Sequence, residues 1–197
     1  MAIIVDKVQK RKDIALTCKT LFVQQGIKNL TISQIAKEAG VGKGTLYDYF
    51  KNKEDIVFEI FNILLAEHND IKEEKMSQAP TTKEKIKVFF EFFYNDEVEL
   101  RELYKEFVSI SLTEPNSQMN EFHAKCYVKY VDWFRNILQE GVDKGEIIEQ
   151  SIALSNGLFA LGKGMFISSC VSNCTENLQN ELENYLDTLF DLIEVKK

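Results

Sequence analysis

Apolar residues recur along most of the chain at the three- and four-residue spacing of α-helices. The first such stretch covers residues 6–25, in which Ile14, Cys18 and Phe22 fall on one helical face. Gly26 follows the last apolar position and is the expected C-terminal stop. The pattern therefore predicts a helix of about five turns at the start of the chain.

Two short helices separated by a glycine turn are predicted next. Thr31 and Gln34 have the Thr-x-x-Gln spacing of a capping box, which begins the first of these helices. Gly40 ends it after about two turns. The second spans about residues 43–50 and places Leu46 on its buried side.

The remaining pattern predicts a wholly helical chain. The sequence has only two prolines, and its glycines are few outside a small number of clusters. Further helices are expected near residues 53–75, 82–95, 97–112, 117–143, 151–171 and 176–194. The prediction is an all-α protein of nine helices, with a three-helix domain at residues 1–52 and a larger helical domain at residues 53–197.

The two short helices have the spacing of a helix-turn-helix. In that motif the first helix crosses the DNA backbone and the second enters the major groove. On a helical wheel centred on Leu46, the outward positions are Gly44 and Asp48, flanked by Thr45 and Tyr47. Most of these groups are small or flat and suit a close approach to DNA.

The charge distribution supports this interpretation, although the net charge of −7 is unfavourable for binding nucleic acid. Residues 1–56 hold ten Lys/Arg and six Asp/Glu, whereas residues 57–197 hold fourteen and twenty-five. Phosphate attraction acts locally, because charges beyond a Debye length of about 8 Å are screened. A basic N-terminal segment is thus compatible with DNA binding despite an acidic remainder.

The segment TISQIAKEAGVGKGTLYDYFKNKEDI resembles the DNA-binding head of tetracycline-repressor-like (TetR) regulators. The matching features include Ile35-Ala36, Ala39-Gly40-Val41, Gly44-Thr45, Tyr49-Phe50 and Lys53-Glu54. The motif covers about fifty residues, and the nine-helix outline matches over the rest. The resemblance implies a homodimeric repressor that binds a double-stranded DNA operator and is released by a small, largely apolar or aromatic inducer.

The expected DNA contacts follow from residue type and from the family register. Lys43 can reach a guanine or a phosphate, and Lys53 lies at a helix N-terminus, where anions are favoured. The alternative is that Tyr47 and Tyr49 pack beneath the next helix and that Lys53 is merely solvated. The expected DNA-binding residues are Ser33, Lys43, Gly44, Thr45, Tyr47, Tyr49 and Lys53.

Two positions depart from the family pattern. Gly42 stands where a serine often caps the second short helix, and glycine is nearly as good a cap. Asp48 places a carboxylate on the outward side, where it would repel phosphate. Its expected roles are to accept a hydrogen bond from a cytosine amino group or to pair with Lys51.

Aromatic residues crowd the middle of the chain. Such stripes usually form a hydrophobic core, but the resemblance implies an inducer site among these helices. His123 and Cys126 lie one turn apart within the aromatic stretch and are candidate ligand contacts. The candidate ligand-binding residues are Phe89, Phe93, Tyr104, Phe107, Phe122, His123, Cys126, Tyr127, Tyr130 and Trp133.

The last two helices are expected to form a four-helix dimer interface. Small residues such as Gly157, Gly162 and Gly164 would let a partner backbone come close. The alternative is that both helices bury their apolar faces within one chain. The candidate interface residues are Leu158, Leu161, Met165, Leu178, Leu182, Tyr185 and Leu189.

Other classes of function receive little support. Two histidines and no metal-spaced cluster provide neither a nucleophile with its base nor a metal site, so an enzyme, a metal or a cofactor is not expected. Cys170 and Cys174 lie at i, i+4, which leaves a thiol-based redox sensor as an alternative. A ligand-independent DNA-binding structural protein of the same fold is another alternative. No signal peptide or membrane span is evident, so a cytoplasmic location is expected.

Overall fold

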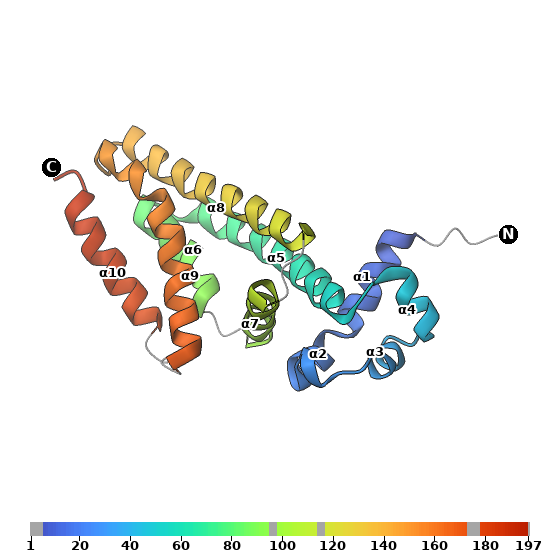
Figure 1. Ribbon diagram of the computed structural model, residues 1–197. Helices are drawn as coiled ribbons and strands as arrows, with labels where there is room; N and C mark the ends of the chain where they lie inside the picture. Colours follow the sequence, from blue (N-terminus) through green and yellow to red (C-terminus); the bar gives the residue numbers. More distant parts are fainter. Residues whose placement is uncertain (1–5, 95–97, 114–116, 173–177, 197) are drawn as a thin grey trace. The chain divides into compact units, whose positions relative to one another are not determined.

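The computed structural model describes residues 6–94, 98–113, 117–172 and 178–196, and its regular elements in these ranges are all helices (Figure 1). The all-α prediction is confirmed. One isolated antiparallel bridge joins Ile147 to Glu194. No helix in the described ranges has the length and apolar content needed to cross a membrane.

The expected first helix is divided into two. α1 (Lys7–Thr17) is capped by the Asp6 carboxylate, which accepts hydrogen bonds from the amides of Val8 and Gln9. Cys18 ends α1 and precedes α2 (Lys19–Gln25), and its buried thiol lies 3.7 Å from the Ile35 carbonyl oxygen. The short 3₁₀ turn η1 (Ile27–Asn29) follows Gly26, whose φ of +70° favours glycine.

The helix-turn-helix is formed by α3 (Ile32–Glu38) and α4 (Lys43–Tyr49). The predicted capping box is present at the start of α3. Gly40 has a φ of +64°, and the hydrogen bonds Val41 N to Ala36 O (3.0 Å) and Gly40 N to Lys37 O (3.1 Å) form a Schellman motif. The motif ends α3 and sets the turn that leads to α4.

The chain separates into two compact units, which we call the head unit (Met1–His68 and Glu97–Pro115) and the body unit (Asn69–Asp96 and Asn116–Lys197). These units differ from the division expected at residue 52. The head unit also contains the first part of α5 (Lys53–Gln78) and all of α7 (Val98–Thr113). The Phe61 ring of α5 stacks on Phe107 of α7, with ring centroids 4.3 Å apart, which explains this grouping.

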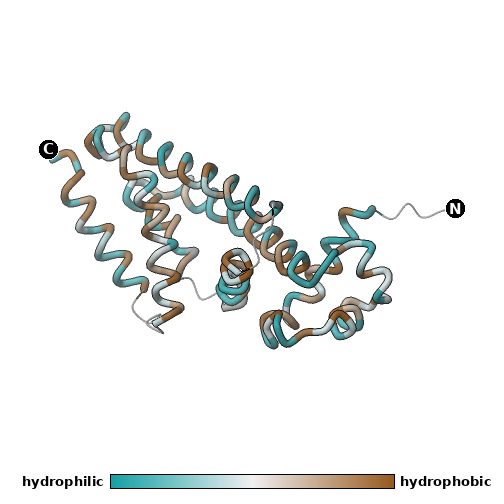
Figure 2. The backbone as a smooth tube through the Cα atoms, in the orientation of Figure 1, coloured by the Kyte–Doolittle hydropathy of each residue, from teal (hydrophilic) through white to brown (hydrophobic). Residues whose placement is uncertain are grey.

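Helices α6 (Thr82–Tyr94), α8 (Ser117–Asp143), α9 (Ser155–Ser172) and α10 (Leu178–Ile193) make up most of the body unit. The 3₁₀ turn η2 (Glu149–Leu154) was not expected and delays the start of α9. Apolar and polar residues alternate around these helices (Figure 2). The helix starts expected near residues 97 and 176 lie outside the described residues.

Gly162 permits a close approach between α9 and α6. A Cβ atom at this position would lie 2.7 Å from Phe90 and closer still to Phe93. Glycine at this position is therefore required by the packing of α9 against α6 within the chain.

Candidate DNA-binding surface and interior sites

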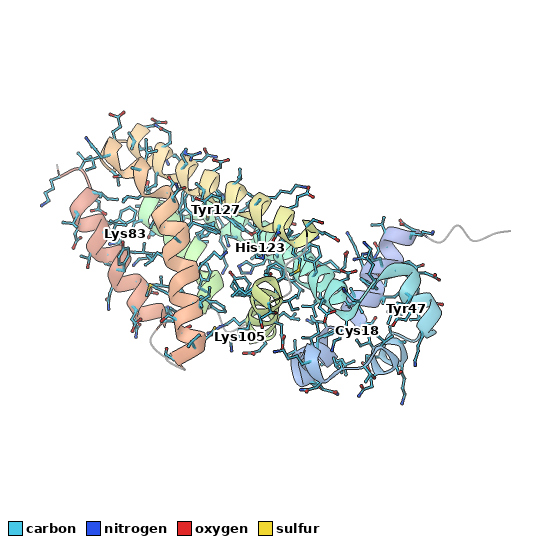
Figure 3. All side chains as sticks on the ribbon, viewed as in Figure 1. Cys18, Tyr47, Lys83, Lys105, His123 and Tyr127 are labelled. Carbon is cyan, nitrogen blue, oxygen red and sulfur yellow. The ribbon has the colours of Figure 1, made fainter. Side chains whose placement is uncertain are left out.

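Helix α4 turns one side inward and the other to solvent. Leu46 is only 1% exposed and anchors the helix in the head unit. Lys43, Gly44 and Thr45 are exposed, and Tyr47 is 56% exposed (Figure 3). The Tyr47 ring thus does not pack beneath a neighbouring helix. Its phenol has the accessibility that a contact to phosphate or to a base edge requires.

Three further positions around this face differ in accessibility. Ser33 on α3 is exposed, as the predicted DNA contact requires. Asp48 is exposed on the outer side of α4. Tyr49 is half-buried at the end of α4, which leaves only part of its side chain accessible to a DNA backbone.

Lys53 has an internal role that the sequence did not indicate. Its Nζ donates hydrogen bonds to the carbonyl oxygens of Ile27 (2.7 Å), Leu30 (3.3 Å) and Lys28 (3.4 Å). The lysine at the start of α5 therefore holds the η1 turn in place. This geometry favours a structural role over the expected phosphate contact.

Arg11 of α1 is a positioning residue that the sequence analysis missed. Its guanidinium donates to the Tyr49 carbonyl oxygen and to a Glu59 carboxylate oxygen at 2.9 Å. The same group lies 4.1 Å from the centre of the Phe50 ring. Arg11 thus connects the end of α4 to α1 and α5. Its chain position gives no signal of this role, since the three partners are about 40 to 50 residues away.

The aromatic residues expected to line one ligand site belong to both units. Tyr104 and Phe107 lie on α7 and stack on Phe61 in the head unit. Phe93 lies in the body unit, with its ring centroid 6.1 Å from that of Phe166. The other candidates are body-unit residues on α6 and α8, namely Phe89, Phe122, His123, Cys126, Tyr127, Tyr130 and Trp133.

Three of these rings pack together, and the amine of Lys72 on α5 lies against them. Its Nζ lies 4.3 Å from the centre of Phe89, 5.7 Å from Tyr130 and 5.8 Å from Trp133. The Tyr130 hydroxyl donates to Asn69 Oδ1 at 3.0 Å, which fixes that ring. Lys72 is 4% exposed, and burial, helped by the nearby Lys129 charge, lowers its pKa to about 7.

His123, Cys126 and Tyr127 lie on α8, and His123 and Tyr127 are labelled in Figure 3. Phe159 of α9 packs against Tyr127 with ring centroids 5.7 Å apart. Burial lowers the pKa of His123, and the neighbouring Lys163 ammonium lowers it further. Burial also raises the pKa of the Cys126 thiol to about 11. A thiol with this pKa stays protonated at neutral pH and is a poor nucleophile.

Two open hollows lie in the body unit. One, of about 300 Å³, is lined by Glu73, Met76, Ser77, Lys85, Trp133, Asn136, Ile137 and Glu140. The other, of about 580 Å³, has a highly charged lining that includes Lys83 (Figure 3), Lys87 and Glu194. Lys83 and Lys87 both pair with Asp187, at 2.9 and 2.8 Å. The charged lining makes the larger hollow unsuitable for an apolar inducer.

The candidate interface residues fall into two groups. Leu158, Leu178 and Leu182 are buried within the chain. Leu161, Met165 and Leu189 are half-buried, and Tyr185 is exposed. The structure adds exposed apolar residues on the same two helices that were not chosen from the sequence, namely Ile167, Val171 and Leu192.

One of the two cysteines proposed as a redox pair lies in the described residues. Cys170 is a half-buried free thiol near the end of α9. Cys174 lies outside the described residues. Burial raises the pKa of the Cys18 thiol to about 11, as it does for Cys126, so these two thiols stay protonated at neutral pH.

Comparisons with known proteins agree with this arrangement. Residues 18–60 match the model of the family described as bacterial regulatory proteins, tetR family. The fatty acid metabolism regulator protein of Bacillus subtilis (strain 168) is 33% identical over 140 residues, which cover 66% of this chain and 66% of that protein. This match spans just under two thirds of the relative's length.

Solved structures of other proteins share the fold. A TetR-family transcriptional regulator from Cytophaga hutchinsonii superimposes with a TM-score of 0.75 at 17% identity, covering 98% of this chain and 99% of that one. The fatty acid degradation regulator FadR from Bacillus halodurans gives a TM-score of 0.68 at 22% identity, covering 92% and 94%. Together with the helix-turn-helix geometry and the family match, these likenesses lead to one conclusion: the chain belongs to the TetR family of transcriptional regulators.

Proposed function

We propose that this protein represses transcription by binding an operator through the outer face of α4. The observation that carries the proposal is the accessibility of Lys43, Gly44, Thr45 and Tyr47 on a helix anchored by buried Leu46. A cation and two hydroxyl groups can contact phosphates or base edges. Gly44 has no heavy atom within 4 Å of a Cβ position, so its side of the helix is open to a groove.

The protein binds DNA as a homodimer in this proposal. A single seven-residue recognition helix reads few base pairs, and a second copy adds a half-site about 34–36 Å away. The partner would pack against the open face of α9 and α10. On that face Gly157 and Gly164 have no atom near a Cβ position, and Val171 and Tyr185 are exposed.

The inducer in this proposal is small and largely apolar, and it binds in the body unit. The aromatic interior built from Phe89, Tyr130, Trp133 and Phe159 supports this class of ligand. The names of the relatives from B. subtilis and B. halodurans, both regulators in fatty acid metabolism or degradation, agree with an apolar ligand. Release of the operator requires the inducer to bind more tightly to the conformation that does not bind DNA.

A genome-wide selection for DNA bound by the purified protein tests the proposal. We expect enrichment of a palindromic sequence with half-sites about one helical turn apart. The Lys43→Ala variant should not enrich this sequence, whereas a matched lysine variant on the body unit, Lys125→Ala, should enrich it as the wild type does. Absence of any enriched sequence with the wild type would overturn the proposal. The enriched operator then serves to screen apolar metabolites for release.

A further inference from the structure

The centre of the outward face of α4 is formed by two residues, Gly44 and Asp48. Successive residues of an α-helix turn by about 100°, so both lie within about 20° of the direction opposite buried Leu46. Thr45 and Tyr47 flank them on either side, and Tyr47 is labelled in Figure 3. Because glycine has no side chain, Asp48 is the residue whose side chain extends from the centre of this face.

The Asp48 carboxylate is exposed, and in the described part of the chain it makes no hydrogen bond or ion pair. The expected pairing with Lys51 is therefore not found among these residues. The Lys51 amide donates instead to Asp55 Oδ2 at 3.0 Å. Helical side chains point back toward the N-terminus of their helix, so the carboxylate leans toward Gly44, where a Cβ atom would meet no heavy atom within 4 Å. The carboxylate is thus available to a ligand outside the protein.

The dimensions of the major groove direct this carboxylate toward base edges when α4 enters the groove as proposed. An α-helix with its side chains is about 10–12 Å across, and the groove is about 12 Å wide. The flanks of the outward face then lie beside the phosphate backbones, and the centre of the face lies toward the bases. Lys43, Thr45 and Tyr47 are on the flanks, whereas Asp48 is at the centre.

The chemistry of a carboxylate restricts the base that it can contact. An ionised carboxylate only accepts hydrogen bonds, and guanine and thymine present acceptor atoms in the major groove, which repel it. Adenine presents its N6 amino group beside the N7 acceptor. Cytosine presents its N4 amino group with no acceptor beside it on the same base. Cytosine is therefore the base that a carboxylate favours.

We propose that Asp48 determines operator specificity by accepting a hydrogen bond from the N4 amino group of a cytosine in each half-site. This role rests on the proposed function, because it requires α4 to lie in the major groove. The carboxylate also repels phosphates, so it lowers the affinity for DNA that lacks the cytosine. Asp48 thereby disfavours guanine and thymine at this position and selects cytosine.

A selection from random duplex DNA with full-length wild type, Asp48→Asn and Asp48→Ala identifies the position. We expect one selected cytosine per half-site with wild type. Asp48→Asn should prefer adenine there, because a carboxamide pairs with the N6 and N7 atoms of adenine. Asp48→Ala should show no base preference at that position. Asp70→Asn, which removes an exposed carboxylate of the body unit, is the matched control and should select the wild-type sequence.

The outcomes separate this role from the proposed function. A wild-type sequence that Asp48→Asn selects unchanged would overturn the role of Asp48 alone. Failure of the wild type to select any sequence would overturn the proposed function and this role together. Neither substitution at Asp48 removes a hydrogen bond or ion pair within the described residues, so we expect both variants to fold as the wild type does.

Fluorescence anisotropy with a modified operator tests the amino group itself. In N4-methylcytosine a methyl group replaces the amino hydrogen that faces the major groove, and the remaining hydrogen still pairs with guanine. At the selected cytosine this change should weaken wild-type binding about tenfold and change the affinity of Asp48→Ala by less than about twofold. The same modification at a cytosine outside the half-sites is the control. Equal losses in wild type and Asp48→Ala would show that the methyl group acts sterically and would contradict the hydrogen bond.

Discussion

Two glycines in the helix-turn-helix, Gly40 and Gly44, differ in whether their backbone conformation requires glycine. Gly40 has a φ of +64°, whereas Gly44 lies inside α4 with an ordinary helical backbone. Neither has an atom within 4 Å of a Cβ position, so steric crowding does not distinguish them. Backbone conformation alone requires glycine at residue 40.

Gly40→Ala should lower the free energy of unfolding by about 1–2 kcal/mol, because alanine is strained in the left-handed region. Gly44→Ala is the matched control and should raise it by about 0.5–1 kcal/mol, because alanine favours the helix. Urea unfolding of the two variants measures both values. The Gly44 variant should nevertheless bind the operator more weakly, since its methyl group lies on the DNA-facing side. Equal operator affinity would remove Gly44 from the interface.

The sequence could predict residue roles where one local pattern determines them. The capping box at Thr31 and the stop at Gly40 depend on neighbouring residues, and both were found as expected. Lys53 was expected to contact DNA because it lies at a helix N-terminus. Its carbonyl partners in the η1 turn are more than twenty positions away, and no local rule indicates them.

At the scale of elements, Arg11 connects the end of α4 to α1 and α5 without lying on the exposed face. Arg11→Ala should weaken operator binding because α4 loses its fixed orientation. The salt dependence of binding should stay the same, because a residue that contacts no phosphate releases no counterions. Fluorescence anisotropy at several salt concentrations measures both quantities. A decrease of the salt slope by about one would show instead that Arg11 contacts a phosphate.

Helix α5 carries a buried amine whose ionisation should affect stability. The pKa of Lys72 is about 7 in the folded protein, against an ordinary value of 10.5. Between these values the unfolded chain binds a proton that the folded chain does not, so stability rises with pH by up to about 1.4 kcal/mol per unit. Urea unfolding from pH 7 to pH 10 should show this rise for wild type relative to Lys72→Met. A constant difference between the two proteins over that range would contradict a lowered pKa.

Hydrophobic spacing predicted many of the helix boundaries, but not the break at Cys18, the η2 turn or the assignment of helices to units. The interior of α4 and the length of α8 follow from local periodicity. The stacking of Phe61 on Phe107 places α7 in the head unit, although the two residues are 46 positions apart. The same limit applies to the three rings that contact the Lys72 amine, because they come from α6 and α8.

For the whole molecule, the proposed dimer predicts different effects of substitutions at two glycines of α9, Gly164 and Gly162. Gly164→Arg should dissociate the dimer and weaken operator binding, because the open face can no longer accept a partner helix. Sedimentation equilibrium measures the oligomeric state. Gly162→Ala should instead destabilise the protomer by about 1–3 kcal/mol through its clash with Phe90 and Phe93. An intact dimer in the Gly164 variant would place the interface elsewhere.

We propose that a dimer of this protein binds DNA through the exposed face of α4. The most direct test is a titration of the selected operator, at several salt concentrations, with wild type, Tyr47→Ala and the exposed-tyrosine control Tyr127→Ala. We expect two protomers per operator, a steep salt dependence and a loss of at least tenfold in affinity for Tyr47→Ala alone. Unchanged affinity in Tyr47→Ala, or equal losses in both tyrosine variants, would contradict the proposal.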